Sequence, residues 1–207
     1  MYKEKYSFDK YFQIATKSWY HEYEKFILEN IDKLNINHLS INPNITMDFV
    51  KKNPQIQWDV NGLCLNPNIK INDIINNPQI QWNIDYVSLN PNITINDIIN
   101  NPQIQWNINN LSGNPNITIN DIINNPQIQW NINNLSGNPN ITMDYVKNNP
   151  LKHWDYWSLS VNPNITMDDV NQDMNLDNPI IKWHPLFLSG NPNLTIDFVL
   201  SNPQIQW

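Results

Sequence analysis

The sequence lacks arginine, has only four glycines and contains a single cysteine among its 207 residues. One cysteine excludes an internal disulfide. No apolar run approaches the roughly 18 residues of a membrane span, and the N-terminal residues MYKEKYSFDK contain no apolar core of a signal peptide. We therefore expect a soluble protein of a reducing compartment, cytoplasmic and not secreted, with no membrane association.

The charge is also one-sided. Twelve lysines face 19 acidic residues, which gives a formal charge of −7. An acidic chain without arginine is poorly suited to bind nucleic acid or an anionic membrane. Hydrophobic residues make up 40% of the chain, which is too many for a typical disordered protein.

Asparagine, isoleucine and proline are abundant instead, and they recur with a fixed period. One series of prolines is spaced by 24 residues except for its last step, and a second series is followed four residues later by tryptophan. The repeats start at Asn42, Asn66, Asn90, Asn114, Asn138, Asn162 and Asn191. The sixth repeat carries a five-residue insertion within residues 171–177, the seventh stops at Trp207, and the third and fourth are identical. A period of this length is typical of repeat architectures.

Each repeat divides into two halves, and each half has the pattern of a short helix. In the first half, Thr94 is positioned as an N-cap, and Asp97 follows three residues later as in a capping box. In the second half, Asn107 or Asp155 takes the cap position. The next Asn-Pro ends each helix, because a residue before proline is pushed out of the α region, and its asparagine favours an Asx turn.

Helices of about two turns are marginal in isolation, so they need stacked neighbours. We therefore predict an all-α fold, an α-solenoid of 24-residue two-helix repeats. The recurring tryptophans should form a buried structural ladder: Trp58, Trp82, Trp106, Trp130, Trp154, Trp183 and Trp207. A β-containing solenoid is the alternative, although the strand signature of leucine-rich repeats is missing. The other alternative is a disordered Asn/Gln-rich segment, which the fixed spacing of proline and tryptophan opposes.

The N-terminal residues differ from the repeats. Residues 18–34 have the spacing of an amphipathic helix, residues 7–17 of a further short helix, and residues 35–40 match the second half of a repeat. We expect residues 1–41 to form an N-terminal helical cap with a half repeat and residues 42–207 to form the repeat solenoid. A partner-binding helix is the alternative role for the cap. The last repeat would leave its core edge open, which suggests a fragment, a decayed reading frame or an assembly surface for end-to-end self-association.

The repeated pattern W-[ND]-x-x-x-L-S-x-N-P-N-[IL]-T resembles that of repeat proteins encoded in many copies by giant DNA viruses, commonly written WDW-x-x-LS-x-NPNIT. The stretch from Trp154 to Ser160 comes closest, and the similarity covers residues 34–207. Lys70 in place of the capping threonine departs from the pattern, as do isoleucine or valine in place of the second aromatic residue in repeats one to four. The resemblance implies a viral repeat protein in the host cytoplasm but no mechanism.

Signatures of chemistry are weak. Asp173, Asn175 and Asp177 match the opening of a calcium loop, but Asn178 stands where glycine is needed, so a solvated acidic insertion is preferred. His153 and His184 lie in adjacent repeats, yet zinc needs three or four ligands. The Asn-x-Thr sequons are interpreted as turns and caps. We therefore expect no catalytic residue, no metal site and no cofactor.

Repeats five and six break the polar consensus together, which marks them as the candidate partner-binding surface. Their distinctive residues are Lys152, His153, Tyr156, Trp157, Lys182, Leu186 and Phe187. Large aromatic side chains anchor many protein contacts. The alternative is that they only fill a junction around the insertion.

We expect a non-enzymatic scaffold that binds a host or viral protein. The alternative is a structural or virion component that self-associates through its open C-terminal repeat. A helical-repeat code for nucleic acid is opposed by the charge, by the absence of arginine and by the identical repeats.

Overall fold

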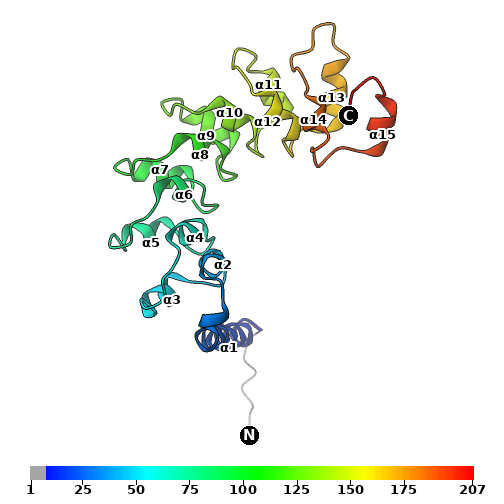
Figure 1. Ribbon diagram of the computed structural model, residues 1–207. Helices are drawn as coiled ribbons and strands as arrows, with labels where there is room; N and C mark the ends of the chain where they lie inside the picture. Colours follow the sequence, from blue (N-terminus) through cyan, green and yellow to red (C-terminus); the bar gives the residue numbers. More distant parts are fainter. Residues whose placement is uncertain (1–7) are drawn as a thin grey trace. The chain divides into compact units, whose positions relative to one another are not determined.

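A computed structural model describes residues 8–207, with side chains from residue 15 onward. This part of the chain contains fifteen α-helices, one 3₁₀ helix and no strand (Figure 1). The described chain divides into two compact parts, residues 8–82 and 83–207. Among the described residues no helix is both long and apolar enough to span a bilayer.

The N-terminal part begins with a single long helix, α1 (Phe8–Glu29), followed by the 3₁₀ helix η1 (Ile31–Lys33). The predicted break between residues 17 and 18 is absent, and the helix ends five residues earlier than expected. Only part of the predicted apolar face is covered: Ile27 is buried, whereas Phe26 is exposed and Trp19 stacks on Tyr23 with ring centroids 5.1 Å apart.

The repeats contribute the remaining helices, two in each of the first six repeats, as predicted, and one in the shortened seventh. The first helices are α3 (Met47–Lys52), α5 (Ile71–Ile75), α7 (Ile95–Asn100), α9 (Ile119–Asn124), α11 (Met143–Lys147), α13 (Met167–Met174) and α15 (Ile196–Ser201). The second helices are α4 (Val60–Leu65), α6 (Ile84–Val87), α8 (Ile108–Gly113), α10 (Ile132–Ser136), α12 (Tyr156–Val161) and α14 (Pro185–Leu188), preceded by the half repeat α2 (Ile36–Ile41).

Local capping explains where these helices begin. The Thr94 hydroxyl accepts the N–H of Asp97, and the Asp97 carboxylate accepts the N–H of Thr94 in return, which confirms the predicted capping box. Asn107 caps α8 as expected. At Lys70 the threonine bond is missing, and only the Asp73 carboxylate accepts the cap N–H, at 3.0 Å.

Second helices of consecutive repeats pack against one another, α2 on α4 in the N-terminal part and α8, α10, α12 and α14 in turn in the C-terminal part (Figure 1). The residues that fill this core recur at fixed repeat positions; Ile93, Leu111 and Ile117 are fully buried. The described residues thus form an all-α solenoid, in which each repeat buries its apolar face against the next.

A ladder of buried asparagines joins the repeats. From the second repeat onward the first asparagine of each repeat is buried, and at five of these six positions its amide donates to backbone carbonyls of the preceding repeat. Asn138 Nδ2, for example, lies 2.9 Å from the carbonyl oxygens of both Ser112 and Asn114. The same contacts are made by Asn66 in the N-terminal part and by Asn114, Asn162 and Asn191 in the C-terminal part. Each Oδ1 accepts the N–H two residues on, which confirms the predicted Asx turns.

A second link between repeats runs through a serine near the end of the second helix, which is the residue after Leu111 in the third repeat. Ser112 donates its hydroxyl to the Ile108 carbonyl and accepts the N–H of Asn131, the cap residue of the following repeat, at 2.9 Å. The serine hydroxyl therefore bridges two consecutive repeats.

The tryptophan ladder is less buried than predicted. Trp154 is 6% exposed, but the other six are half-buried. Their placement follows from one hydrogen bond: Trp106 Nε1 donates to the Asn101 carbonyl at 3.2 Å, and the same bond recurs at Trp58, Trp82, Trp130, Trp154 and Trp207. The indole ring therefore lies along the edge of the core with its N–H satisfied, as a buried tryptophan requires.

We expect Trp106→Ala to lower the free energy of unfolding by about 2–3 kcal/mol, less than full burial would give, because part of the ring already contacts solvent. Urea denaturation followed by circular dichroism measures the change. The neighbouring exposed residue Gln105, changed to alanine, should stay within about 0.5 kcal/mol of the parent. Equal effects of the two substitutions would contradict a structural role for the ladder.

Candidate protein-binding surface

Three rings from adjacent second helices form an aromatic cluster, which we define as Trp157, His184 and Phe187. The Trp157 and Phe187 rings are stacked, with centroids 5.5 Å apart and planes 8° from parallel. The His184 ring meets both of them edge-on, at 5.7 Å from Trp157 and 5.0 Å from Phe187. Trp157 nevertheless remains 57% exposed, and its neighbour Leu186 is 70% exposed.

The repeat register explains why these rings meet. Trp157 is the second residue of α12, whereas His184 and Phe187 are the N-cap and third residue of α14. The equivalent positions elsewhere in the C-terminal part are polar, and some are hydrogen-bonded across repeats: Asp85 accepts from the side chain of Asn107 at 2.7 Å, and its carbonyl accepts from Asn110. Stacked rings therefore replace a row of amide and carboxylate contacts at one point of the array.

His184 is atypical for its position. Other second helices are capped by an asparagine or aspartate side chain, but His184 makes no side-chain cap bond to α14. Its Nδ1 is buried without a hydrogen-bond partner in the described structure. An unsatisfied buried polar atom costs about 1–3 kcal/mol, so this repeat has exchanged a cap for ring packing.

The other predicted site residues are placed around the cluster in different ways. Tyr156 and Lys152 are half-buried, and His153 and Lys182 are exposed in the loops that precede α12 and α14. Of the seven predicted residues, only Trp157 and Phe187 contact each other through their rings in the part of the chain whose side chains are described. The sequence suggests His184 only as a zinc ligand. Its place in the cluster follows from the stacking of repeats, which sequence spacing alone does not reveal.

Leu151 was also missed. It is 92% exposed in the loop before α12, where the regular repeats have a glutamine. The sequence signal for Leu151 was the change from Gln-Ile-Gln in the regular repeats to Leu-Lys-His in the fifth. An almost fully exposed leucine adds apolar surface to the region that departs from the consensus.

The insertion in the sixth repeat is not simply a solvated acidic loop. Asp173, which stands where other repeats have an asparagine, is fully buried. Its carboxylate accepts the N–H groups of Ile180 and Ile181, at 3.0 and 3.2 Å, and Trp183 Nε1 at 2.9 Å. The preference for a solvated insertion is therefore wrong at Asp173, whereas Asp177 is exposed as expected.

No group of three or more His, Cys, Asp or Glu side chains in the described part of the chain could hold a metal ion. The Asp173 carboxylate is occupied by three N–H donors.

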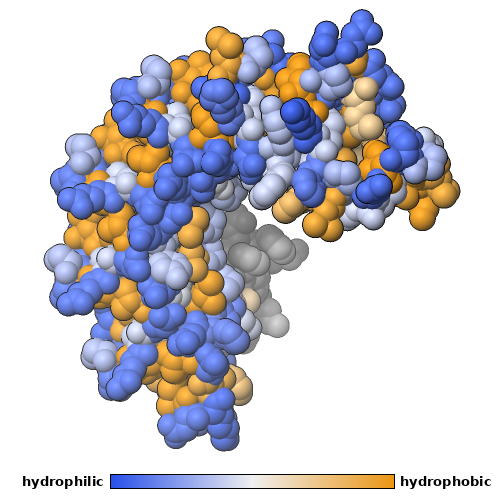
Figure 2. Space-filling model, turned by 45° about the horizontal axis from the view of Figure 1, so that its top comes forward, coloured by the Kyte–Doolittle hydropathy of each residue, from blue (hydrophilic) through white to orange (hydrophobic). Residues whose placement is uncertain are grey.

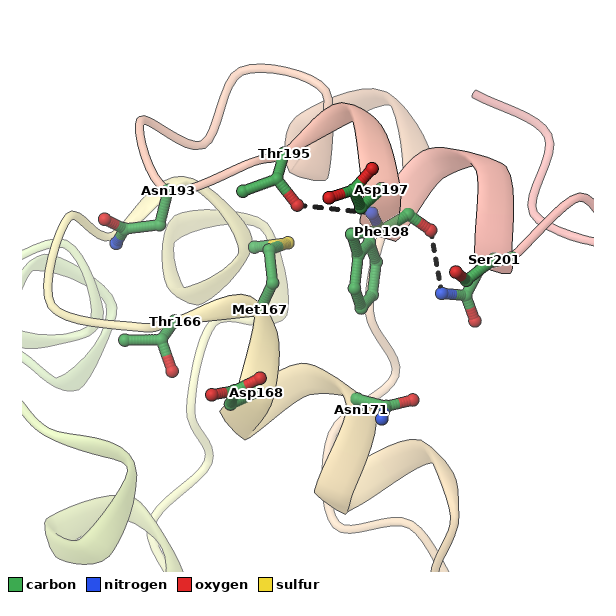
Figure 3. Close-up of a pocket in the computed structure, with 10 residues that line it drawn as sticks. Thr166, Met167, Asp168, Asn171, Asn193, Thr195, Asp197, Phe198 and Ser201 are labelled. Carbon is green, nitrogen blue, oxygen red and sulfur yellow. Dashed lines mark hydrogen bonds between the residues drawn. The ribbon is translucent and has the colours of Figure 1, made fainter.

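A hollow of about 490 Å³ lies between the first helices α13 and α15 (Figure 3). Met167 and Phe198 point into it, and Asp168 and Asp197 lie on its two helices. The Phe198 backbone is fixed at both ends, by the Thr195 hydroxyl and by the Asn202 amide. Its ten lining residues include no lysine, histidine or cysteine.

Apolar side chains elsewhere are broken up by polar ones. On the face shown in Figure 2, orange patches alternate with blue hydrophilic side chains. Single exposed apolar residues are normal on a protein surface, so the stacked rings stand out by their contact geometry and by their departure from the repeat.

Comparison with known proteins adds no relative: no family model, no curated protein and no solved structure matches the chain. The class of protein is therefore defined by its own architecture, an all-α repeat protein with an asparagine ladder.

Proposed function

We propose that this protein is a non-enzymatic repeat scaffold that binds another protein through the aromatic cluster of α12 and α14. The observation that carries the proposal is the Trp157–Phe187 stack, whose rings lie where the other repeats form polar contacts while Trp157 stays 57% exposed. Given the resemblance to giant-virus repeats, the partner is a host or viral protein.

Three properties of the cluster favour a protein over other ligands. Aromatic side chains that are held rigid lose little conformational entropy on binding and are frequent anchors of protein interfaces. The exposed leucines Leu151 and Leu186 offer further apolar area in the same two repeats. The net charge of −7 disfavours nucleic acid.

We expect the double variant Trp157→Asn and Phe187→Asn to stay folded, with a loss of no more than about 1–2 kcal/mol, because one ring pair is lost. Binding of the partner should weaken by about 30-fold or more, as is typical for interface anchors. Parent and variant are compared by affinity capture from infected cells with mass spectrometry, followed by titration of the purified partner. Ile123→Asn is the matched control, because Ile123 is also 57% exposed but lies on α9. A folded double variant that captures every partner of the parent would falsify the proposal.

A further inference from the structure

The hollow between α13 and α15 has an apolar floor (Figure 3). Met167 on α13 and Phe198 on α15 point into it, so it lies between the first helices of two consecutive repeats. Its volume of about 490 Å³ falls within the range of ligand pockets, about 300–1,000 Å³. The hollow is therefore large enough to take a long side chain.

The position of the Phe198 ring is a property of the repeat. The ring meets Trp207 edge-on, with centroids 5.8 Å apart. The same edge contact recurs at 5.9 Å between Phe49 and Trp58 in the first repeat and between Tyr145 and Trp154 in the fifth. The Phe198 ring is thus held in place while it faces the hollow.

Two carboxylates flank this apolar floor. Asp168 and Asp197 are the second residues of α13 and α15, and both are exposed. In the part of the chain whose side chains are described, neither carboxylate takes part in a hydrogen bond or an ion pair. The next residue, Asp169, differs, because its carboxylate accepts the N–H and the hydroxyl of Thr166 in a capping box.

The helices do not need an acid at this position for their caps. The third and fourth repeats have Asn96 and Asn120 there, and their helices α7 and α9 keep complete capping boxes. Asp168 and Asp197 therefore add negative charge to the hollow, and its ten lining residues include no lysine or histidine to balance that charge. An anionic rim over an apolar floor is complementary to a cation with an apolar stem.

We propose that this hollow binds the side chain of an arginine residue on a partner protein. The five N–H donors of a guanidinium group would bond carboxylates on both helices. The Phe198 ring would stack on the guanidinium plane, and Met167 would contact the methylenes of the stem. Arginine fits better than lysine, because its planar group stacks on aromatic rings and is less strongly hydrated.

This site is separate from the aromatic cluster. It lies on the first helices α13 and α15, whereas the cluster lies on the second helices α12 and α14. The inference therefore goes beyond the proposed function and does not rest on it. The double variant Trp157→Asn and Phe187→Asn should bind an arginine probe as the parent does.

The probe is the blocked peptide acetyl-Gly-Arg-Gly-amide, titrated into the full chain with ¹³C-labelled methionine methyl groups and followed by NMR. We expect a saturable shift of the Met167 signal, with a Kd of about 1 mM. Met167→Leu identifies that signal. Met143 is the internal control, because it occupies the same repeat position on α11, is 2% exposed and does not line the hollow.

Two matched peptides test the recognition. Citrulline in place of arginine keeps the shape of the side chain but removes its charge, and binding should weaken by at least about tenfold. Lysine in place of arginine keeps the charge but loses the planar group, and binding should weaken by about threefold or more.

Three variants of the chain locate the charges. Asp168→Asn and Asp197→Asn should each weaken binding of the arginine peptide by about fivefold, and both should fold, because asparagine is found at this position in other repeats. Asp144→Asn is the matched control: Asp144 has the same repeat position and is exposed, but it lies on α11 and does not line the hollow. This variant should bind as the parent does.

The absence of a saturable Met167 shift up to about 10 mM arginine peptide would overturn the inference. Equal binding of the arginine and citrulline peptides, or equal effects of the three aspartate variants, would also overturn it. Lysine binding as tight as arginine binding would contradict the assignment to arginine. Loss of partner capture by the aromatic-cluster variant, with unchanged arginine binding, would support both sites independently.

Discussion

Replacing Asn138 with alanine is expected to lower the free energy of unfolding by about 3–5 kcal/mol, since each net hydrogen bond contributes about 1 kcal/mol and buried orphans cost more. Asn138 is fully buried, and its amide donates to the carbonyls of Ser112, Asn114 and Ile117. Its Oδ1 also accepts the N–H of Asn140 at 2.8 Å. Alanine would remove all four of these hydrogen bonds.

The matched control is Asn133→Ala, an exposed asparagine on α10 of the adjoining repeat. It should change stability by no more than about 0.5 kcal/mol, because alanine is the better helix former and no buried bond is lost. Urea denaturation followed by circular dichroism compares the two. Because a repeat array couples nearest neighbours, the Asn138 variant is also expected to unfold over a broader range of urea. A parent-like midpoint for Asn138→Ala would show that the ladder contributes little.

The second large effect is expected at Asp173. Its buried carboxylate accepts three N–H groups, and the alanine variant loses these bonds. Asp173→Ala should therefore lower the free energy of unfolding by about 3–5 kcal/mol, a net figure that allows for the cost of burying the carboxylate. The loss should be visible as a lower urea midpoint. Asp173→Asn restores the residue of the other repeats but keeps fewer acceptor sites, and a loss of about 1–2 kcal/mol is expected.

A double-mutant cycle identifies the cause. Deleting residues 174–178 joins position 173 directly to Pro179 and restores the regular loop length. We expect Asp173→Asn to be destabilising in the parent chain but neutral or stabilising in the deletion background, since asparagine then meets the geometry found in other repeats. The same cost in both backgrounds would mean that the insertion and the carboxylate are independent.

The Asp173 bonds could not be predicted from sequence. The motif around Asp173 suggests a solvated loop, because acidic residues between proline-rich turns are usually exposed. The fold buries it instead, since the insertion turns back and presents the N–H groups of Ile180 and Ile181 to the carboxylate. The available signal was that Asp173 replaces the repeat asparagine only where the insertion occurs.

The binding surface was predicted in part. Its location in repeats five and six follows from the break in the consensus, which is visible in the sequence. That Trp157 meets Phe187, and that His184 gives up its cap for ring packing, depends on how one second helix lies against the next. Lys152 and His153 share the same break but lie in the preceding loop.

The sequence by itself determined the period, the two helices per repeat and their caps, because these depend on groups three or four residues apart. Thr94 and Asp97 form their capping box within a single turn of backbone. Tertiary structure alone decided which polar groups are buried between repeats. The Asn138 amide reaches carbonyls 24 and 26 residues earlier. Such contacts exist only once repeats stack, so no local pattern could specify them.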